Sequence, residues 1–391
     1  MLHKMRLRQL RLASGYSLDA LAHKMEGLVT KQAISKYETG KAQPTQAVLN
    51  KLASALGVKA ATLTSEPKFE VNFHGFRKRA KLRARAAEEI QSKVAALLEQ
   101  RITLQGFYKH HEPARVPFKS FPVRSTEEAE TAANRLRDTW ELGTAPISDV
   151  TNTLEEHLIH VLELKGTKHF DGLSATAVNE SGEVVGGAVV SSFESSGERQ
   201  RFNLAHELGH LVMNVVGNVN EEDTANRFAS AFLAPRDTVL ALTGVQRHHI
   251  SLSELILLKQ RLGMSIQAIL YRLKDLCVIS ETLHRGWCID INKQGWRKNE
   301  PEALPREEPR WFRRAILQAV TESWITKEEG EIMLAERLDL DEPLSLADRK
   351  AFMKLPLEER RRIMAKQAEE LAEHYNSDNE WREVEGGDII E

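Results

Sequence analysis

Apolar residues in the first sixty positions recur at helical spacing, between glycine and proline residues that interrupt the pattern. They predict four short amphipathic helices, at residues 4–13, 17–25, 30–38 and 46–56. Ser17 and Thr30 suit N-cap positions, because a hydroxyl oxygen there can accept a hydrogen bond from a free backbone amide. The third helix would bury Ile34 and expose polar side chains. Such spacing is typical of a helix-turn-helix fold.

The pattern changes in the middle of the chain. Residues 173–178 and 184–191 flank the turn residues 179–182, which predicts two strands in a tight hairpin. One helical stripe follows, made of Leu204, Leu208, Leu211, Val212 and Val215. A second helix is predicted at residues 221–235, with an apolar face made of Ala225, Phe228, Ala229 and Phe232. A strand beside the first helix could bind a peptide in extended form.

The first of these two helices carries the sequence His206-Glu-Leu-Gly-His210. Imidazoles at positions i and i+4 of a helix converge on one Zn²⁺, and Glu207 between them can act on its water as a general base. Zinc in a peptidase takes three protein ligands, so the chain must supply a third. We expect Glu222, because it lies one turn before Ala225 and close to the buried edge of the second helix.

Three segments around this sequence resemble the ImmA/IrrE family of zinc metallopeptidases, over roughly residues 110–285. They are Arg201-Phe-Asn-Leu-Ala-His-Glu-Leu-Gly-His210, Glu222-x-x-Ala-Asn-x-Phe-Ala229 and Leu233-x-Pro235. The resemblance implies a zincin-like α+β domain in which His206, His210 and Glu222 bind Zn²⁺ and Glu207 is the catalytic base. It also implies a protein substrate, because members of the family cleave repressors of the Xre type.

Plainer interpretations of the site stay open. The two helices could pack without a metal, or zinc could be retained for structure alone. The group that would stabilise the oxyanion is not assigned. His169, His248 and His249 are candidates by residue type, although such a histidine is more often an ordinary surface or loop residue.

The amino-terminal helices resemble the Cro/CI (Xre-type) DNA-binding domain, over essentially all of residues 4–60. The matching segments are Leu18-Asp-Ala-Leu-Ala22, residues 32–41, Pro44 and residues 52–58. We expect four residues of the third helix to read base edges, namely Gln32, Ala33, Ser35 and Lys36, and two lysines to approach phosphates, namely Lys31 and Lys41. Residues 26–30 exceed the usual turn between the second and third helices, which would shift the docking angle of the third.

The net charge of −2 conceals an asymmetry. Residues 1–85 hold 17 Lys and Arg against 5 Asp and Glu, a net charge of +12 that favours binding to phosphates. Six of these basic residues fall within residues 77–85, at the start of a long helix predicted to continue to Leu98. This basic run is either a solvated helix face or an additional phosphate contact.

These features divide the chain into five segments. They are a helix-turn-helix domain (1–65), a basic connecting helix (66–110), a zinc peptidase domain (111–290), a helical segment (300–340) and a charged tail (341–391). Two packed helices are expected around Gly263, and three prolines within residues 299–309 indicate a linker. The fold class is therefore multidomain and mainly α, with an all-α amino-terminal domain and one α+β domain.

The tail is predicted to form an amphipathic helix at residues 354–375, with a weak apolar side made of Ile363, Ala368, Leu371 and Tyr375. It loosely resembles antitoxins encoded beside PemK/MazF-type toxins, which would imply a toxin partner. A solvated terminal helix is the alternative.

Cysteine content and hydropathy indicate a cytoplasmic protein with no membrane partner. Cys277 and Cys288 are too few for a disulfide scaffold and fit ordinary core positions. Residues 1–6 lack a following apolar segment of the kind that signal peptides carry, and no apolar run approaches the roughly 18 residues that span a bilayer.

The function that follows is a DNA-binding transcriptional regulator with a zinc-dependent endopeptidase, which acts on itself or on a related Xre-type repressor. Its partners would be double-stranded operator DNA and that protein substrate. A homodimer is expected, because such repressors read paired half-sites. The alternative is a non-enzymatic repressor and antitoxin, in which the zinc domain serves as a sensor or scaffold.

Overall fold

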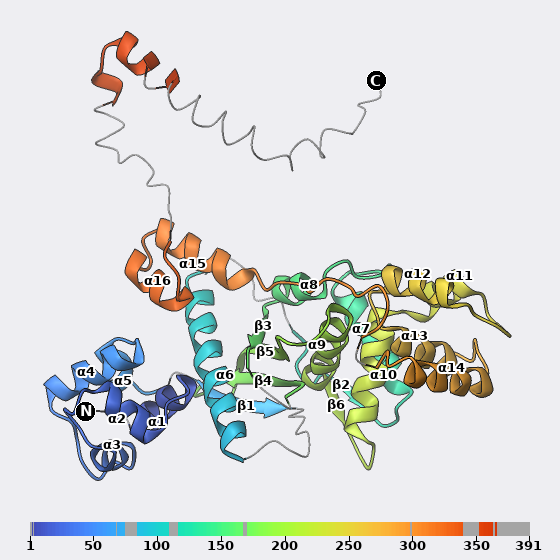
Figure 1. The fold of residues 1–391 in the computed structure, drawn as a ribbon, viewed down its shortest axis with the longest axis horizontal. Helices are drawn as coiled ribbons and strands as arrows, with labels where there is room; N and C mark the ends of the chain where they lie inside the picture. Colours follow the sequence, from blue (N-terminus) through green and yellow to red (C-terminus); the bar gives the residue numbers. More distant parts are fainter. Residues whose placement is uncertain are drawn as a thin grey trace. The chain divides into compact units, whose positions relative to one another are not determined.

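The computed structural model describes residues 2, 4–67, 69–74, 84–108, 116–166, 170–297, 299–338, 352–362 and 364–365 of the 391-residue chain. The chain divides into two units, Met1–Glu336 and Arg337–Glu391. The first unit holds every helix and strand that Figure 1 labels.

The amino-terminal domain is helical, as the sequence predicts. Its helices are α1 (Lys4–Ala13), α2 (Leu18–Lys24), α3 (Lys31–Glu38), α4 (Gln46–Leu56) and α5 (Ala60–Thr64). The side chains of Ser17 and Thr30 cap α2 and α3 by accepting hydrogen bonds from backbone amides three residues later, which confirms both predicted caps. Ile34 is fully buried in the core of the domain. The five-residue helix α5 was not predicted.

Two residues in the long connection between α2 and α3 have a left-handed backbone conformation. Glu26 has φ 54° and Gly27 has φ 81°, and Val29 is then buried in the core. Across the domain, Arg11 makes two hydrogen bonds to the Glu38 carboxylate, with N–O distances of 2.6 and 2.9 Å, which fixes α1 against α3.

The connecting segment corrects the expectation of one helix over residues 66–110. It begins with a strand, β1 (Glu70–His74), and the helix that follows is α6 (Ala84–Gln105). Val71 and Phe73 alternate with polar residues, so this stretch pairs as a strand, but five residues gave too weak a signal in the sequence. Of the predicted basic run, only Arg85 lies within the described residues, where it pairs with Glu89 on the same helix.

A four-stranded sheet lies at the centre of the α+β domain. It consists of β1, β3 (Ile159–Leu164), β4 (Gly172–Val178) and β5 (Val184–Ser192), in the order β1-β4-β5-β3. β4 and β5 form the predicted hairpin, whose turn is closed by a hydrogen bond from the Asn179 amide to the Glu183 carbonyl. A second sheet pairs β2 (Phe121–Val123) with β6 (Met213–Val215).

The two faces of the large sheet pack against different helices. Leu173, Ala175 and Val190 lie in one core with α6, whereas Val161 and Val189 pack with the long helix α9 (Gly197–Val212). The remaining helices of this domain are α7 (Glu128–Thr139), α8 (Val150–Glu156), α10 (Glu221–Leu233), α11 (Arg236–Thr243), α12 (Leu252–Leu262), α13 (Ile266–Asp275) and α14 (Glu281–Lys293).

Most of the helices predicted in this domain are observed. α12 and α13 flank Gly263, which caps α12 with φ 67° and confirms the predicted pair. The face of α10 made of Ala225, Phe228, Ala229 and Phe232 is buried as predicted. Val215 is a correction, because α9 ends at Val212 and Val215 pairs with Val123 in the small sheet.

The predicted linker has no helix or strand over residues 299–310, because its prolines are incompatible with a regular hydrogen-bonding pattern. It is nevertheless held tightly, and we call it the strap. The strap crosses the start of α9, where a Cβ on Gly197 would lie 2.1 Å from the Pro305 carbonyl oxygen. The Glu307 carboxylate pairs with Arg201 and accepts hydrogen bonds from the backbone amides of Val150 and Thr151.

The helical segment predicted after the strap consists of two helices, α15 (Trp311–Thr321) and α16 (Lys327–Leu334). Ser323 has φ 60°, which a continuous helix does not allow, and Thr326 starts α16 with a capping box to Glu329.

The second unit is described only at residues 337–338, 352–362 and 364–365, with helical turns at 352–354 and 357–362. The apolar side predicted for the tail lies outside the described residues, so the resemblance to antitoxins stays a prediction from sequence. Among the described helices, none is long and apolar enough to cross a membrane.

Candidate metal centre

Two histidines of α9 face each other within the α+β domain. The Nε2 atoms of His206 and His210 lie 3.1 Å apart. Their side chains are 1% and 5% exposed. One helical turn between the two residues places both imidazoles on one side of the helix, as the sequence spacing predicts.

A carboxylate from α10 completes this group. The oxygens of Glu222 lie 3.6 Å from the Nε2 atom of each histidine, and the Glu222 side chain is 46% exposed. Asn220 caps α10 and accepts hydrogen bonds from the backbone amides of Glu222 and Asp223, which fixes the first turn of the helix. The two helices approach closely at Gly209, where a Cβ would lie 2.9 Å from the ring of Phe228.

The three side chains fit a tetrahedral metal ion. All their ligand atoms lie within 4.8 Å of one another. Zinc with bonds of about 2.0–2.1 Å would separate two ligand atoms by about 3.3 Å, close to the 3.1 and 3.6 Å found here. Two nitrogens and one carboxylate are a donor set that leaves the fourth zinc position for water or substrate.

Glu207 follows His206 on α9, and its carboxylate approaches the sheet. Its side chain is buried, and Oε1 lies 2.8 Å from the point where a Cβ on Gly172 would stand. A side chain at position 172 would therefore occupy the space of the carboxylate. Gly172 is the first residue of β4, so the amino-terminal end of this strand is the part of the sheet that borders the metal centre.

Two basic groups near the centre were not predicted. Burial lowers the pKa of His74, the nearby charges of Lys119 and His210 lower it further, and Glu221 opposes them. Burial also lowers the pKa of Lys119, and Glu221 raises it. Both residues lie far from α9 in the sequence, so no local pattern could have connected them to the site.

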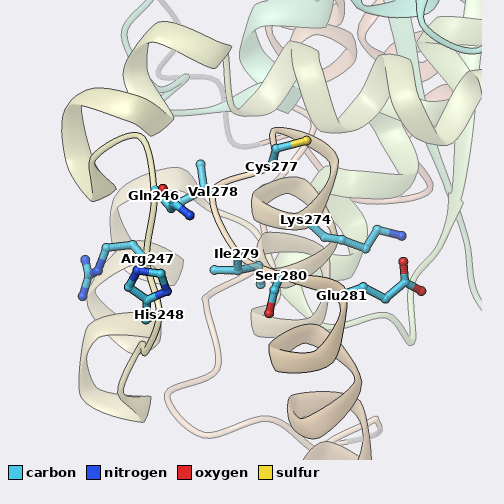
Figure 2. Close-up of a pocket in the computed structure, with 9 residues that line it drawn as sticks. All are labelled: Gln246, Arg247, His248, Lys274, Cys277, Val278, Ile279, Ser280 and Glu281. Atoms are coloured by element: carbon cyan, nitrogen blue, oxygen red, sulfur yellow. The ribbon is translucent and has the colours of Figure 1, made fainter.

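Of the histidines considered for the oxyanion, His248 and His249 do not join the metal-binding group. Figure 2 shows His248 in a pocket with Arg247 and Ser280, and none of the residues that line it is a metal-site residue. His249 follows His248 and is exposed, and His169 lies outside the described residues. The same pocket contains Cys277, which is exposed and therefore is not the core residue that the sequence suggested.

The predicted DNA contacts lie on α3 and just after it. Four of them are exposed, namely Lys31, Gln32, Lys36 and Lys41, whereas Ala33 and Ser35 are partly buried. Ala33 packs against the core of the domain, and Lys31 pairs with Asp19 at 3.1 Å. The exposed set forms a polar, basic surface suited to the edges and phosphates of a DNA groove.

Two parts of the chain match models of known families. Residues 7–63 match the helix-turn-helix family model, and residues 155–274 match the model of the IrrE N-terminal-like domain of the M78 peptidases. The comparison with curated proteins gave no match. The first matched range contains α2, α3 and α4, and the second contains His206, His210 and Glu222. The chain therefore carries a helix-turn-helix domain fused to a domain similar to the IrrE N-terminal-like peptidases.

Proposed function

We propose that this chain is a DNA-binding transcriptional regulator that contains a zinc-dependent endopeptidase. Its substrate would be a peptide bond in the chain itself or in a related Xre-type repressor. The observation that carries the proposal is the convergence of His206, His210 and Glu222 from two helices. Glu207 lies between the two histidines on α9, with its carboxylate against Gly172 of β4.

The residues of the site suit peptide hydrolysis. Zinc held by the three ligands would act as a Lewis acid and make water a nucleophile near neutral pH. Glu207 would accept a proton from the attacking water at a carboxylate oxygen. The same group would return the proton to the amine nitrogen that leaves when the peptide C–N bond breaks. Gly172 leaves the room that this carboxylate needs.

Metal binding should depend on the two histidines. We expect His210→Ala to lose stoichiometric zinc during dialysis, because only two protein ligands would remain. His248→Ala is the matched control, since it removes an imidazole that belongs to the pocket in Figure 2. Zinc would be measured per chain by elemental analysis. Full zinc retention by His210→Ala would contradict the proposed ligand set.

DNA binding should depend on α3. We expect Lys36→Ala to weaken binding to the promoter of the chain's own gene by about 1–3 kcal/mol, roughly fivefold to 150-fold. Lys51→Ala, which removes the same charge from α4, should have a smaller effect, because Lys51 already pairs with Glu26. Gel shifts at fixed low salt would measure both. Equal losses in the two variants would argue against α3 as the reading helix.

A further inference from the structure

The strand β1 is the edge strand of the sheet beside β4, whose first residue borders the metal centre. It pairs antiparallel with β4, in a register from Glu70 opposite Val178 to His74 opposite Ser174. β4 borders the centre through Gly172, two residues before Ser174. The carboxyl end of β1 is therefore the end that points toward Glu207.

An extended peptide binds a sheet by adding a strand to a free edge, where backbone hydrogen bonds give affinity and alternate side chains give specificity. One edge of β4 pairs with β5 and the other pairs with β1. Within the described part of the chain, β4 thus has no open edge. A substrate that pairs with β4 beside Glu207 must first take the place of β1.

The side chains of β1 are arranged like those of a bound peptide. Val71 and Phe73 pack on the α6 side of the sheet. His74 lies on the opposite side, where Nε2 is 2.9 Å from Thr176 Oγ1 and the backbone carbonyl accepts a 3.3 Å hydrogen bond from Ser174.

The side chains of β1 are only partly buried. None of its five side chains is fully buried, and Glu70 and Asn72 are exposed. A strand held by one set of backbone pairs and two half-buried apolar anchors can be exchanged for another strand of similar pattern. Only residues 65–69 connect α5 to β1, so β1 stays close to the DNA-binding domain.

We propose that β1 is an internal occupant of the substrate-binding edge of β4 and excludes other peptides until it is displaced. This inference rests on the proposed peptidase function. The substrate class that fits is an extended polypeptide with apolar residues at the positions of Val71 and Phe73, paired antiparallel to β4. Because β1 directly follows the DNA-binding domain in the chain, access to Glu207 would depend on a strand that is attached to that domain.

Peptide binding to a catalytically inactive chain tests whether β1 occupies the substrate-binding edge of β4. The full chain with Glu207→Gln would be titrated with a fluorescent peptide of residues 69–74, Phe-Glu-Val-Asn-Phe-His, and followed by anisotropy. Adding Val71→Ser and Phe73→Ser should tighten binding about tenfold or more, because β4 is then open in a larger fraction of molecules. Glu70→Ser and Asn72→Ser are the matched control and should bind as weakly as the parent. Equal binding by all three chains would overturn the inference.

A second experiment, in which a disulfide joins β1 to β4, tests the inference if the serine variant fails to fold. Asn72 and Thr176 are opposite partners in β1 and β4, so Asn72→Cys and Thr176→Cys can join the strands by a disulfide. The oxidised chain should lose peptide binding and cleavage, and dithiothreitol should restore both. Unchanged cleavage in the oxidised chain would overturn the inference and leave the peptidase intact. Tighter peptide binding by the serine variant, with no cleavage by any chain, would support the strand exchange and overturn the proposed function.

Discussion

Replacing Glu207 with glutamine should abolish peptide cleavage while the protein keeps its zinc. Glutamine has nearly the same volume, so it fits the space beside Gly172, but it cannot accept and return a proton. We expect the cleavage rate to fall by roughly a hundredfold to ten-thousandfold, the range that general bases contribute. Initial rates, zinc content and the melting temperature would be measured on the same preparations.

The control for this variant is Glu180→Gln, which removes a carboxylate from the exposed turn between β4 and β5. It should cleave at the rate of the unchanged chain. If Glu207→Gln also cleaves at that rate, Glu207 is not the base. If it loses zinc together with activity, the carboxylate supports the metal site rather than the chemistry.

Removing the Glu307 carboxylate should cause a large loss of stability. The Arg201 and Glu307 side chains are 7% and 10% exposed. Arg201 donates further hydrogen bonds to the carbonyls of Ile147, Ser148 and Gly263. Glu307→Ala would leave this guanidinium buried without its counter-ion and remove the acceptor for two amides of α8, so the free energy of unfolding should fall by about 3–5 kcal/mol.

Denaturant unfolding of the full chain would measure this change against Glu308→Ala, the neighbouring exposed glutamate on the strap. The control should alter stability by less than about 0.5 kcal/mol. A Glu307→Ala chain as stable as the control would mean that the strap does not fasten the start of α9.

The sequence predicted the features that local patterns encode. The bounds of α1 and α4 follow from apolar spacing and flanking glycines, and the caps at Ser17 and Thr30 follow from residue type. Glu222 could be chosen because helical periodicity placed it at the edge of a buried face. The structure brings it to both histidines, although its role as a ligand awaits the metal measurement.

The features that the sequence did not reveal depend on residues far apart in the chain. β1 is five residues long, and its partner β4 lies about a hundred positions later. Likewise, Glu307 and Arg201 are 106 residues apart, so the charged strap looked like an ordinary linker. Such contacts depend on chain topology and burial, for which neither periodicity nor residue type carries a local signal.

The central claim is that the residues around His206 hydrolyse peptide bonds. The most direct measurement incubates the zinc-loaded full chain, alone and with an Xre-type repressor encoded nearby, and identifies new chain termini by mass spectrometry. The account predicts defined new termini in one of the two proteins, which disappear on chelation. Intact chains after long incubation, including samples that contain promoter DNA and the Val71→Ser and Phe73→Ser variant, would contradict it.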